Sequence, residues 1–241
     1  MRLFLSLALM AAALASCGPT PPLPAATVAE IKTIGVIVSP WDQVPAVHRG
    51  FTVFTNESQT YSAKDWRLPE AFVDGIRDAL GPRIKVIAIP TVPVPDPEDA
   101  VTSSLRWDLD NIVGPSVRAS SARADAYIYV DFKGRTDPVY FTSRELRGCG
   151  LIDMSSLVSD EHVTKLYCIA NLYVIDAAGT KDMGYTILKS QDHDDVAVAD
   201  LPGFGWQSAR LSPAQIETAS KAMGAAIRSN IPAALTATGL R

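Results

Sequence analysis

Residues 126–132 read Ala-Tyr-Ile-Tyr-Val-Asp-Phe, a run rich in aromatic and β-branched side chains. Its two alternating sets of residues are both largely apolar, which is typical of a central β-strand that is covered on each face of its sheet. We therefore expect this segment to lie in the interior of a sheet, with the rest of the fold built around it.

The segments before this strand alternate between strand-like and helix-like patterns. Residues 31–38 and 83–89 are rich in β-branched side chains and predict buried strands, and residues 51–55 predict an edge strand. An amphipathic stripe over residues 69–80, opened by a proline and followed by Gly-Pro, predicts a helix. A weaker helical pattern covers residues 116–124.

The segments after the central strand change character. Residues 149–154 and 165–176 both predict strands, and a tight turn over residues 176–180 leads to a hairpin partner at residues 183–188. A strand, helix, strand order followed by an antiparallel meander predicts a mixed sheet. The expected fold class is therefore α/β, with α+β as the alternative, in a single domain packed by helices.

The last helix of the expected fold begins after Ser212. Ser212 and Gln215 have the spacing of a capping box, and Pro213 occupies the first helical position. Pro232 is expected to kink or end this helix. Apolar residues recur at helical spacing and predict that one face packs against the sheet: Ile216, Ala219, Met223, Ile227 and Ile231.

The composition of the chain excludes several classes of protein. Of its 241 residues, 47% are hydrophobic, which is too apolar for a disordered chain. With 22 Lys and Arg against 26 Asp and Glu, the net charge is −4, so a nucleic-acid partner is not expected. Three cysteines are too few for a disulfide-dense scaffold.

The amino-terminal segment has the layout of a secretory signal peptide. Arg2 supplies a positive charge, and residues 3–14 are 12 uncharged, mostly apolar positions followed by small residues. A helix of that length reaches only about 18 Å, which is shorter than the roughly 30 Å hydrocarbon core of a membrane. A cleaved signal over residues 1–16 is therefore favoured over a membrane-spanning helix.

The sequence Leu14-Ala15-Ser16-Cys17 resembles the lipobox of bacterial lipoproteins. The resemblance implies that a diacylglyceryl group is attached to the sulfur of Cys17, that residues 1–16 are removed, and that the new amino terminus is acylated, as with palmitate. The alternative is an ordinary cleaved signal with a chance cysteine. Because Gly18 is not an aspartate, the resemblance favours the outer membrane over the inner membrane.

The lipid would make Cys17 the membrane anchor, since two or more acyl chains give stable attachment without a spanning helix. The segment 17–24 is rich in proline, which extends the chain at about 3.1 Å per residue and predicts a short, stiff tether. Residues 25–241 then form one globular periplasmic domain.

Two further cysteines, Cys149 and Cys168, each lie in a predicted strand. If the two strands are neighbours, their spacing suits a disulfide, which an oxidising periplasm would favour. The alternative is a pair of buried free thiols that behave as small apolar residues. A metal site at these cysteines is not expected, because no CxxC motif or paired histidine lies near them.

The remaining polar clusters give weak signals for chemistry. Asp192, His193 and Asp194 could hold a divalent cation, but a solvated acidic loop is favoured because calcium-loop spacing is absent. A second cluster holds the atoms of a Ser-His-Asp set, but groups so close in sequence rarely reach triad geometry. Its residues are Asp153, Ser155, Ser156, Asp160, Glu161 and His162. We therefore expect no catalytic residues and no cofactor.

The segment from residue 191 to residue 211 shows neither strand nor helix periodicity. It contains Leu201, Phe204 and Trp206, and aromatic residues exposed on a long loop often anchor partners. The alternative is that these side chains fold back as a small satellite core.

Together these features predict a membrane-anchored envelope lipoprotein that docks or assists another envelope protein and is not an enzyme. The alternative is a lipid-anchored periplasmic hydrolase or metal-dependent enzyme that uses the neighbourhood of His162 or His193. A solute-binding lipoprotein is disfavoured, because a single domain offers no evident pair of lobes.

Overall fold

The structure, a computed structural model, describes residues 21–49, 57–93, 109–132, 137–138, 145–155, 162–188, 197–201 and 211–241. Its helices are α2 (Ala25–Glu30), the 3-10 turn η3 (Ala63–Trp66), α3 (Leu68–Leu80), α4 (Leu109–Ile112), α5 (Gly114–Ala119) and α6 (Pro213–Thr238). Its main strands are β1 (Thr33–Val38), β2 (Gln43–Arg49), β3 (Glu57–Ser62), β4 (Lys85–Ala88), β5 (Ala126–Asp131), β8 (Gly148–Ser155), β9 (His162–Asp176), β10 (Asp182–Leu188) and β11 (Ala197–Asp200). Two short strands, β6 (Asp137–Pro138) and β7 (Glu145–Leu146), form a separate pair.

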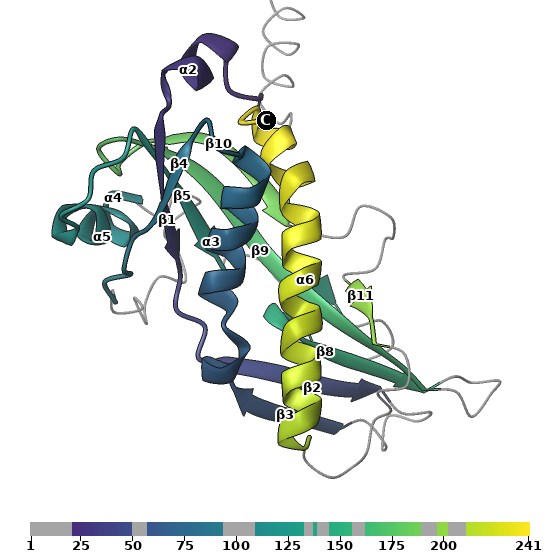
Figure 1. The fold of residues 1–241 in the computed structure, drawn as a ribbon. Helices are drawn as coiled ribbons and strands as arrows, with labels where there is room; N and C mark the ends of the chain where they lie inside the picture. The colour runs from purple at the N-terminus through teal and green to yellow at the C-terminus, as the bar shows by residue number, and fades with distance from the viewer. Residues whose placement is uncertain are drawn as a thin grey trace, which may run out of the picture.

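The 15-residue strand β9 is a central strand of the sheet and pairs with four others (Figure 1). Its second half pairs with β5 and β10, and its first half pairs with β8 and β11. Strands β1 and β4 extend the sheet beyond β5, and strands β2 and β3 extend it beyond β8. In the part of the chain that is described, two five-stranded sheets thus share β9, which gives nine strands in all.

The central strand predicted from residues 126–132 is confirmed as β5. It pairs in parallel with β1 and antiparallel with β9, so both of its edges are occupied. The β1–β4 and β2–β8 pairs are parallel, whereas β8, β9 and β10 form the expected antiparallel meander. The sheet is therefore mixed and the fold is of the α/β class, as predicted.

Helices cover the two faces of the sheet unequally. The main core lies between one face of the sheet and the helices α3 and α6, which run side by side (Figure 1). Gly75 of α3 allows the two helices to approach, because a Cβ atom there would lie only 2.5 Å from Cδ1 of Ile231. The opposite face around β1, β4 and β5 packs against α4 and α5 in a smaller core.

Helix α6 begins where the sequence predicts and ends later than one of the two expectations for Pro232. Ser212 and Gln215 form the predicted capping box, with the Ser212 hydroxyl accepting from the Gln215 backbone. The helix continues through Pro232 to Thr238, so the expectation that it could end there is wrong. Gly239 ends the helix with a positive φ of 81°, a conformation that glycine adopts without strain.

Several expected boundaries shift. The edge strand predicted at residues 51–55 lies outside the described residues, and the sequence did not predict β2 and β3 on either side of it. The weak helical pattern at residues 116–124 corresponds to the shorter α5, which begins at Gly114. Leu23 is buried and its backbone N–H donates to the Thr238 carbonyl at 2.9 Å, so the domain begins slightly before Ala25.

Candidate functional site

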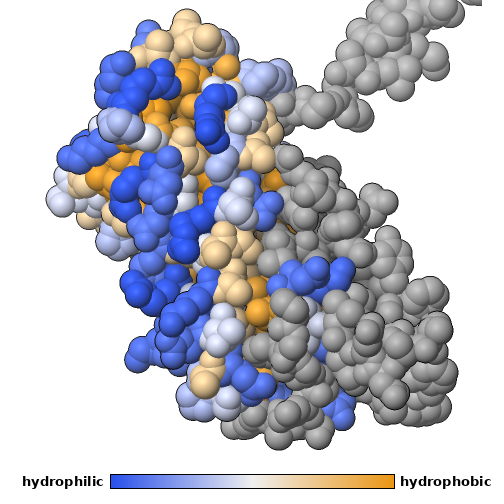
Figure 2. All heavy atoms as spheres, turned by 45° about the vertical axis from the view of Figure 1, so that its right-hand side comes forward, coloured by the Kyte–Doolittle hydropathy of each residue, from blue (hydrophilic) through white to orange (hydrophobic). Residues whose placement is uncertain are grey.

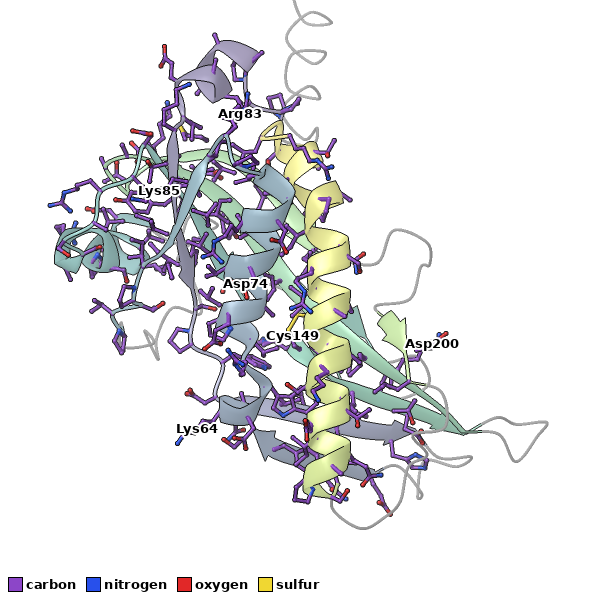
Figure 3. The ribbon with its side chains drawn as sticks, in the orientation of Figure 1. Lys64, Asp74, Arg83, Lys85, Cys149 and Asp200 are labelled. Carbon is purple, nitrogen blue, oxygen red and sulfur yellow. A yellow bond between two sulfur atoms is a disulfide. The ribbon has the colours of Figure 1, made fainter. Side chains whose placement is uncertain are left out.

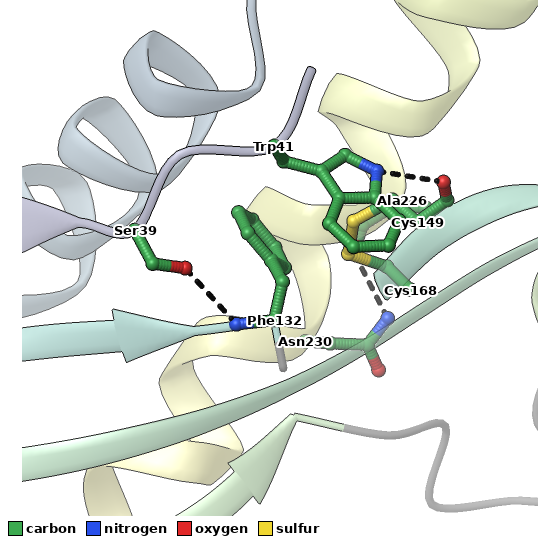
Figure 4. The surroundings of a disulfide bond; sticks show 7 residues. All are labelled: Ser39, Trp41, Phe132, Cys149, Cys168, Ala226 and Asn230. Carbon is green, nitrogen blue, oxygen red and sulfur yellow. Dashed lines mark hydrogen bonds between the residues drawn. A yellow bond between two sulfur atoms is a disulfide. The ribbon is translucent and has the colours of Figure 1, made fainter. Parts of the chain in front are cut away.

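The predicted disulfide between Cys149 and Cys168 is confirmed. The two residues lie directly opposite each other on β8 and β9, and both are fully buried. Trp41 lies over the bridge and donates its indole N–H to the Cys149 carbonyl at 3.2 Å, while Ala226 of α6 lies nearby (Figure 4). The bridge therefore ties two central strands together beneath the longest helix.

Trp41 is accommodated by the glycine that begins β8. Gly148 has a φ of 61°, and a Cβ atom built on it would lie 2.2 Å from the Trp41 ring. On its other side, the Trp41 ring packs against Phe132 with ring centroids 5.6 Å apart. Tryptophan, glycine and disulfide thus form one packed unit at the point where β5 ends and β8 begins.

A row of polar side chains crosses three neighbouring strands on the helix-facing side of the sheet. His48 of β2 is in register with Asp153 of β8, which is in register with Thr164 of β9. The Asp153 carboxylate accepts from His48 Nδ1 at 2.7 Å and from the Thr164 hydroxyl at 2.6 Å. Asp153 is fully buried, and the other two residues are nearly so.

The order of this row differs from that of a hydrolytic triad. In a triad the hydroxyl donates to the imidazole, and the carboxylate orients the imidazole from the other side. Here Asp153 lies in the middle and receives both hydrogen bonds. The row is therefore a buried hydrogen-bond network that joins β2, β8 and β9. A buried carboxylate requires hydrogen-bond donors of this kind.

Three members of the predicted Ser-His-Asp cluster, Asp153, Ser155 and His162, lie within the described strands β8 and β9. Asp153 contacts His48, which was not among the candidate residues, and the register places Ser155 opposite His162 at the backbone. The other members of that cluster, Ser156, Asp160 and Glu161, lie outside the described residues. The distance of 105 positions between His48 and Asp153 explains why the sequence did not reveal their contact.

The other candidate residues are placed as follows. Leu201 is 7% exposed and belongs to the main core, and its N–H donates to the Thr164 carbonyl at 2.8 Å. Leu201 therefore packs into the main core, and neither a satellite core nor an exposed partner contact describes it. The residues Cys17, Asp192, His193, Asp194, Phe204 and Trp206 all lie outside the described part of the chain.

A hollow follows the outer strand β3. Its volume is about 400 Å³, and it is lined by Ser58, Gln59, Thr60, Tyr61 and Ser62. Tyr61 fixes one side of the strand, because its hydroxyl donates to the Gln59 side chain and accepts from the Leu211 N–H at 3.1 Å. The sequence pattern did not indicate this strand, since its residues, Glu57–Ser62, show no alternation of apolar and polar side chains.

One face of the molecule carries both hydrophilic and hydrophobic residues. Figure 2 shows them interleaved, with the largest hydrophobic area at the upper left of this view. Among the residues whose positions are given, no three His, Cys, Asp or Glu side chains come together as metal ligands would. Within the same residues, no helix combines the length and apolar character that crossing a membrane requires.

Comparison with known proteins found no matching family model, no matching curated protein and no matching solved structure.

Proposed function

We propose that this protein is a lipoprotein of the bacterial envelope, anchored through an acylated Cys17, whose domain binds another envelope protein and does not catalyse a reaction. Two observations support the proposal: the lipobox resemblance, and the positions of the chain entry and of β3 at opposite ends of the domain. The chain enters the domain at one end of α6, and the open strand β3 lies at the other end (Figure 1).

The entry point is fixed by hydrogen bonding. The Leu23 N–H donates to the Thr238 carbonyl, so the proline-rich segment meets the domain beside the carboxyl end of α6. The amino end of α6 contacts the other extreme of the domain, where the Ser220 hydroxyl lies 3.2 Å from the carbonyls of Asp65 and Trp66. A helix of 26 residues is about 39 Å long.

This length supports a binding role away from the membrane. A lipid on Cys17 would hold the Leu23 end of the domain near the bilayer, and α6 would direct the β3 end into the periplasm. Figure 3 shows the same separation, with Lys64 of η3 at one end of the domain and Arg83 towards the other. A partner in the periplasm would therefore meet β2 and β3 first.

The buried disulfide supports an oxidising compartment. Disulfides persist in the periplasm and are rare in the bacterial cytosol. The Cys149–Cys168 bridge joins paired strands of the core, where it stabilises the domain. The outer membrane is the preferred location, because position 18 is Gly and not Asp.

The anchor is tested on the full chain expressed in a bacterial host, by mass spectrometry of its amino-terminal peptide. We expect a chain that begins at Cys17 and carries the mass of acyl groups, and that sediments with membranes. The matched control is Cys17→Ala, which should lose both the added mass and the membrane association. A wild-type chain that keeps residues 1–16, or carries an unmodified Cys17, would overturn the proposal.

The docking role is tested by chemical crosslinking of intact cells that express the wild-type chain. A crosslinked product of one reproducible mass, which weakens when Cys17→Ala releases the chain from the membrane, is the expected result. Recovery of the chain alone in repeated experiments would contradict a docking role.

A further inference from the structure

The outer strands of the sheet differ in how they are protected against pairing with another chain. Exposed sheet edges are usually blocked by lysine, proline, bulges or very short strands. Strand β4 has four residues, begins with the exposed Lys85 and is followed closely by Pro90. Strands β10 and β11 both contain a shift in register against β9.

Strand β3 has none of these protections. Its six residues, Glu57–Ser62, pair with β2 in continuous register and include no lysine and no proline. It is the last strand of the sheet on its side in the described chain. An edge of this kind is a template for a further strand.

The direction of the backbone groups in β3 follows from one hydrogen bond. The Ala63 N–H donates to the Asp42 carbonyl at 2.9 Å, so position 63 faces β2. Backbone groups of an antiparallel strand alternate between its two edges. Ser58, Thr60 and Ser62 therefore direct their N–H and C=O groups outward, away from β2.

The outward positions suit main-chain recognition. Ser58, Thr60 and Ser62 are exposed, uncharged and small, and the charge in β3 is confined to Glu57 at its start, so a strand added along residues 58–62 would meet no charged side chain there. On the other side of the strand, Tyr61 is held by the Leu211 N–H, which keeps β3 in place. The edge is thus both accessible and rigid.

A second copy of this chain fits the edge poorly if the chain is anchored. Two antiparallel β3 strands would be related by a two-fold axis perpendicular to the sheet. Because β3 lies across the end of α6 that is opposite the tether, this axis would direct the two anchors in opposite directions (Figure 1). Two copies on one membrane cannot satisfy that geometry.

From these observations we infer that β3 accepts an extended, uncharged segment of a periplasmic partner protein, which adds to the sheet as a further strand. The inference rests on the proposed docking function and identifies the surface and the chemistry that carry it. Hydrogen bonds to the outward backbone groups of Ser58, Thr60 and Ser62 give the affinity, and side-chain identity matters little.

The test uses the full, anchored chain in cells with a photo-reactive residue at Ser58, and a second set with that residue at the exposed Thr236 beside the tether. We expect an adduct of one discrete mass from position 58 and none from position 236. Thr60→Pro removes an outward N–H and should reduce the adduct about tenfold or more. Thr60→Val keeps the backbone donor and should leave the adduct unchanged.

A second measurement keeps the test independent of how well the proline variant folds. Amide hydrogen exchange is compared between the purified full chain and the chain crosslinked to its partner. The Ser58 and Thr60 amides should exchange fast in the free chain and slowly in the complex, while the Gln59 and Tyr61 amides stay protected in both.

The outcomes separate this inference from the docking proposal. An adduct of twice the mass of the chain would identify a second copy and overturn the inference, as would an adduct that Thr60→Pro leaves intact. Adducts from position 236 alone would overturn strand addition and leave docking in place. Loss of adducts at every position tested would overturn both.

Discussion

The aromatic ring of Tyr127 on β5 lies against Gly35 on the neighbouring strand β1. The two residues are in register, and a Cβ atom at position 35 would lie 2.5 Å from Cδ1 of Tyr127 and 3.0 Å from Ile89. Both residues are buried in the small core beneath α4 and α5. The absence of a side chain at Gly35 therefore makes the space that the ring fills.

Gly35→Ala is expected to destabilise the domain by about 1–3 kcal/mol, because the added methyl group has to displace the buried Tyr127 ring. The measurement is chemical denaturation of the full chain. The matched control is Gly224→Ala in α6, where a Cβ atom would meet its nearest neighbour at an ordinary 3.5 Å. That change should stabilise the domain by about 0.5–1 kcal/mol, since alanine favours the helix.

Tyr127→Phe is expected to leave the stability unchanged or to raise it. The Tyr127 hydroxyl is buried and has no hydrogen-bond partner in the described structure, so removing it removes an unsatisfied group. Tyr61→Phe is the contrasting variant, because the Tyr61 hydroxyl accepts from the Leu211 N–H. Of these two variants, only Tyr61→Phe should lower the midpoint of thermal unfolding. A lower midpoint for Tyr127→Phe would contradict the conclusion that the Tyr127 hydroxyl has no hydrogen-bond partner.

Asp153→Ala is expected to cost about 2–6 kcal/mol, the most of any change in the polar row, because it leaves two buried donors, His48 and Thr164, without their shared acceptor. Thr164→Val removes one donor and should cost about 1–3 kcal/mol. Urea denaturation of both single variants and of the double variant measures the coupling. Strictly additive costs would show that the two residues do not act through one carboxylate.

The parts of the fold that the sequence predicts are those where local pattern and packing agree. Strand β5 is apolar on both faces because it is covered on both, and its residues show this directly. Helix α6 carries a capping box at its start, and Ala219, Met223, Ile227 and Ile231 of its predicted stripe are all fully buried. The disulfide followed from placing both cysteines on strands.

The parts that were missed depend on pairing between distant segments. Strand β3 is polar because it is an edge, so its composition resembles that of a loop. Strand β2 contains Pro45, which usually argues against an interior strand. Pro45 is tolerated because its backbone is directed away from β3 and the β2–β8 ladder starts only at Ala46.

The candidate site was less predictable than the fold. The row His48, Asp153 and Thr164 comes from three strands, and its register is fixed by the apolar residues on either side rather than by any motif. The edge position of β3 likewise depends on the order of strands in the described sheet, where β3 pairs with β2 alone. Neither property belongs to a single segment of sequence.

Removal of the disulfide by Cys149→Ala together with Cys168→Ala is expected to lower stability by about 3 kcal/mol, because the bridge closes a loop of 19 positions. Denaturation of the variant and of the wild type measures this loss. Since both cysteines are buried, a reductant should act on the wild type only when the domain unfolds. Full reduction of the folded chain within seconds would contradict the buried position.

Asp125 is expected to make the stability of the domain depend on acid pH. Its carboxylate accepts from the backbone N–H groups of Lys32 and Thr33, both at 2.8 Å, at the start of β1. These two hydrogen bonds, with a smaller contribution from the Lys32 charge, hold the pKa of Asp125 below its ordinary value of 3.8. A carboxyl group whose pKa is lower in the folded state favours folding while it is ionised.

The stabilisation by Asp125 is thus complete above the unfolded-state pKa and is lost as the pH falls through the lower, folded-state pKa. Asp125→Asn keeps the shape and removes the charge, so it should be less stable than the wild type at neutral pH. The difference should shrink as the pH falls below about 4. Unfolding midpoints of both chains from pH 7 to pH 2 measure it, with Asp78→Asn on an exposed face of α3 as the control. A gap between Asp125→Asn and the wild type that stays constant over this range would show that the Asp125 charge does not contribute.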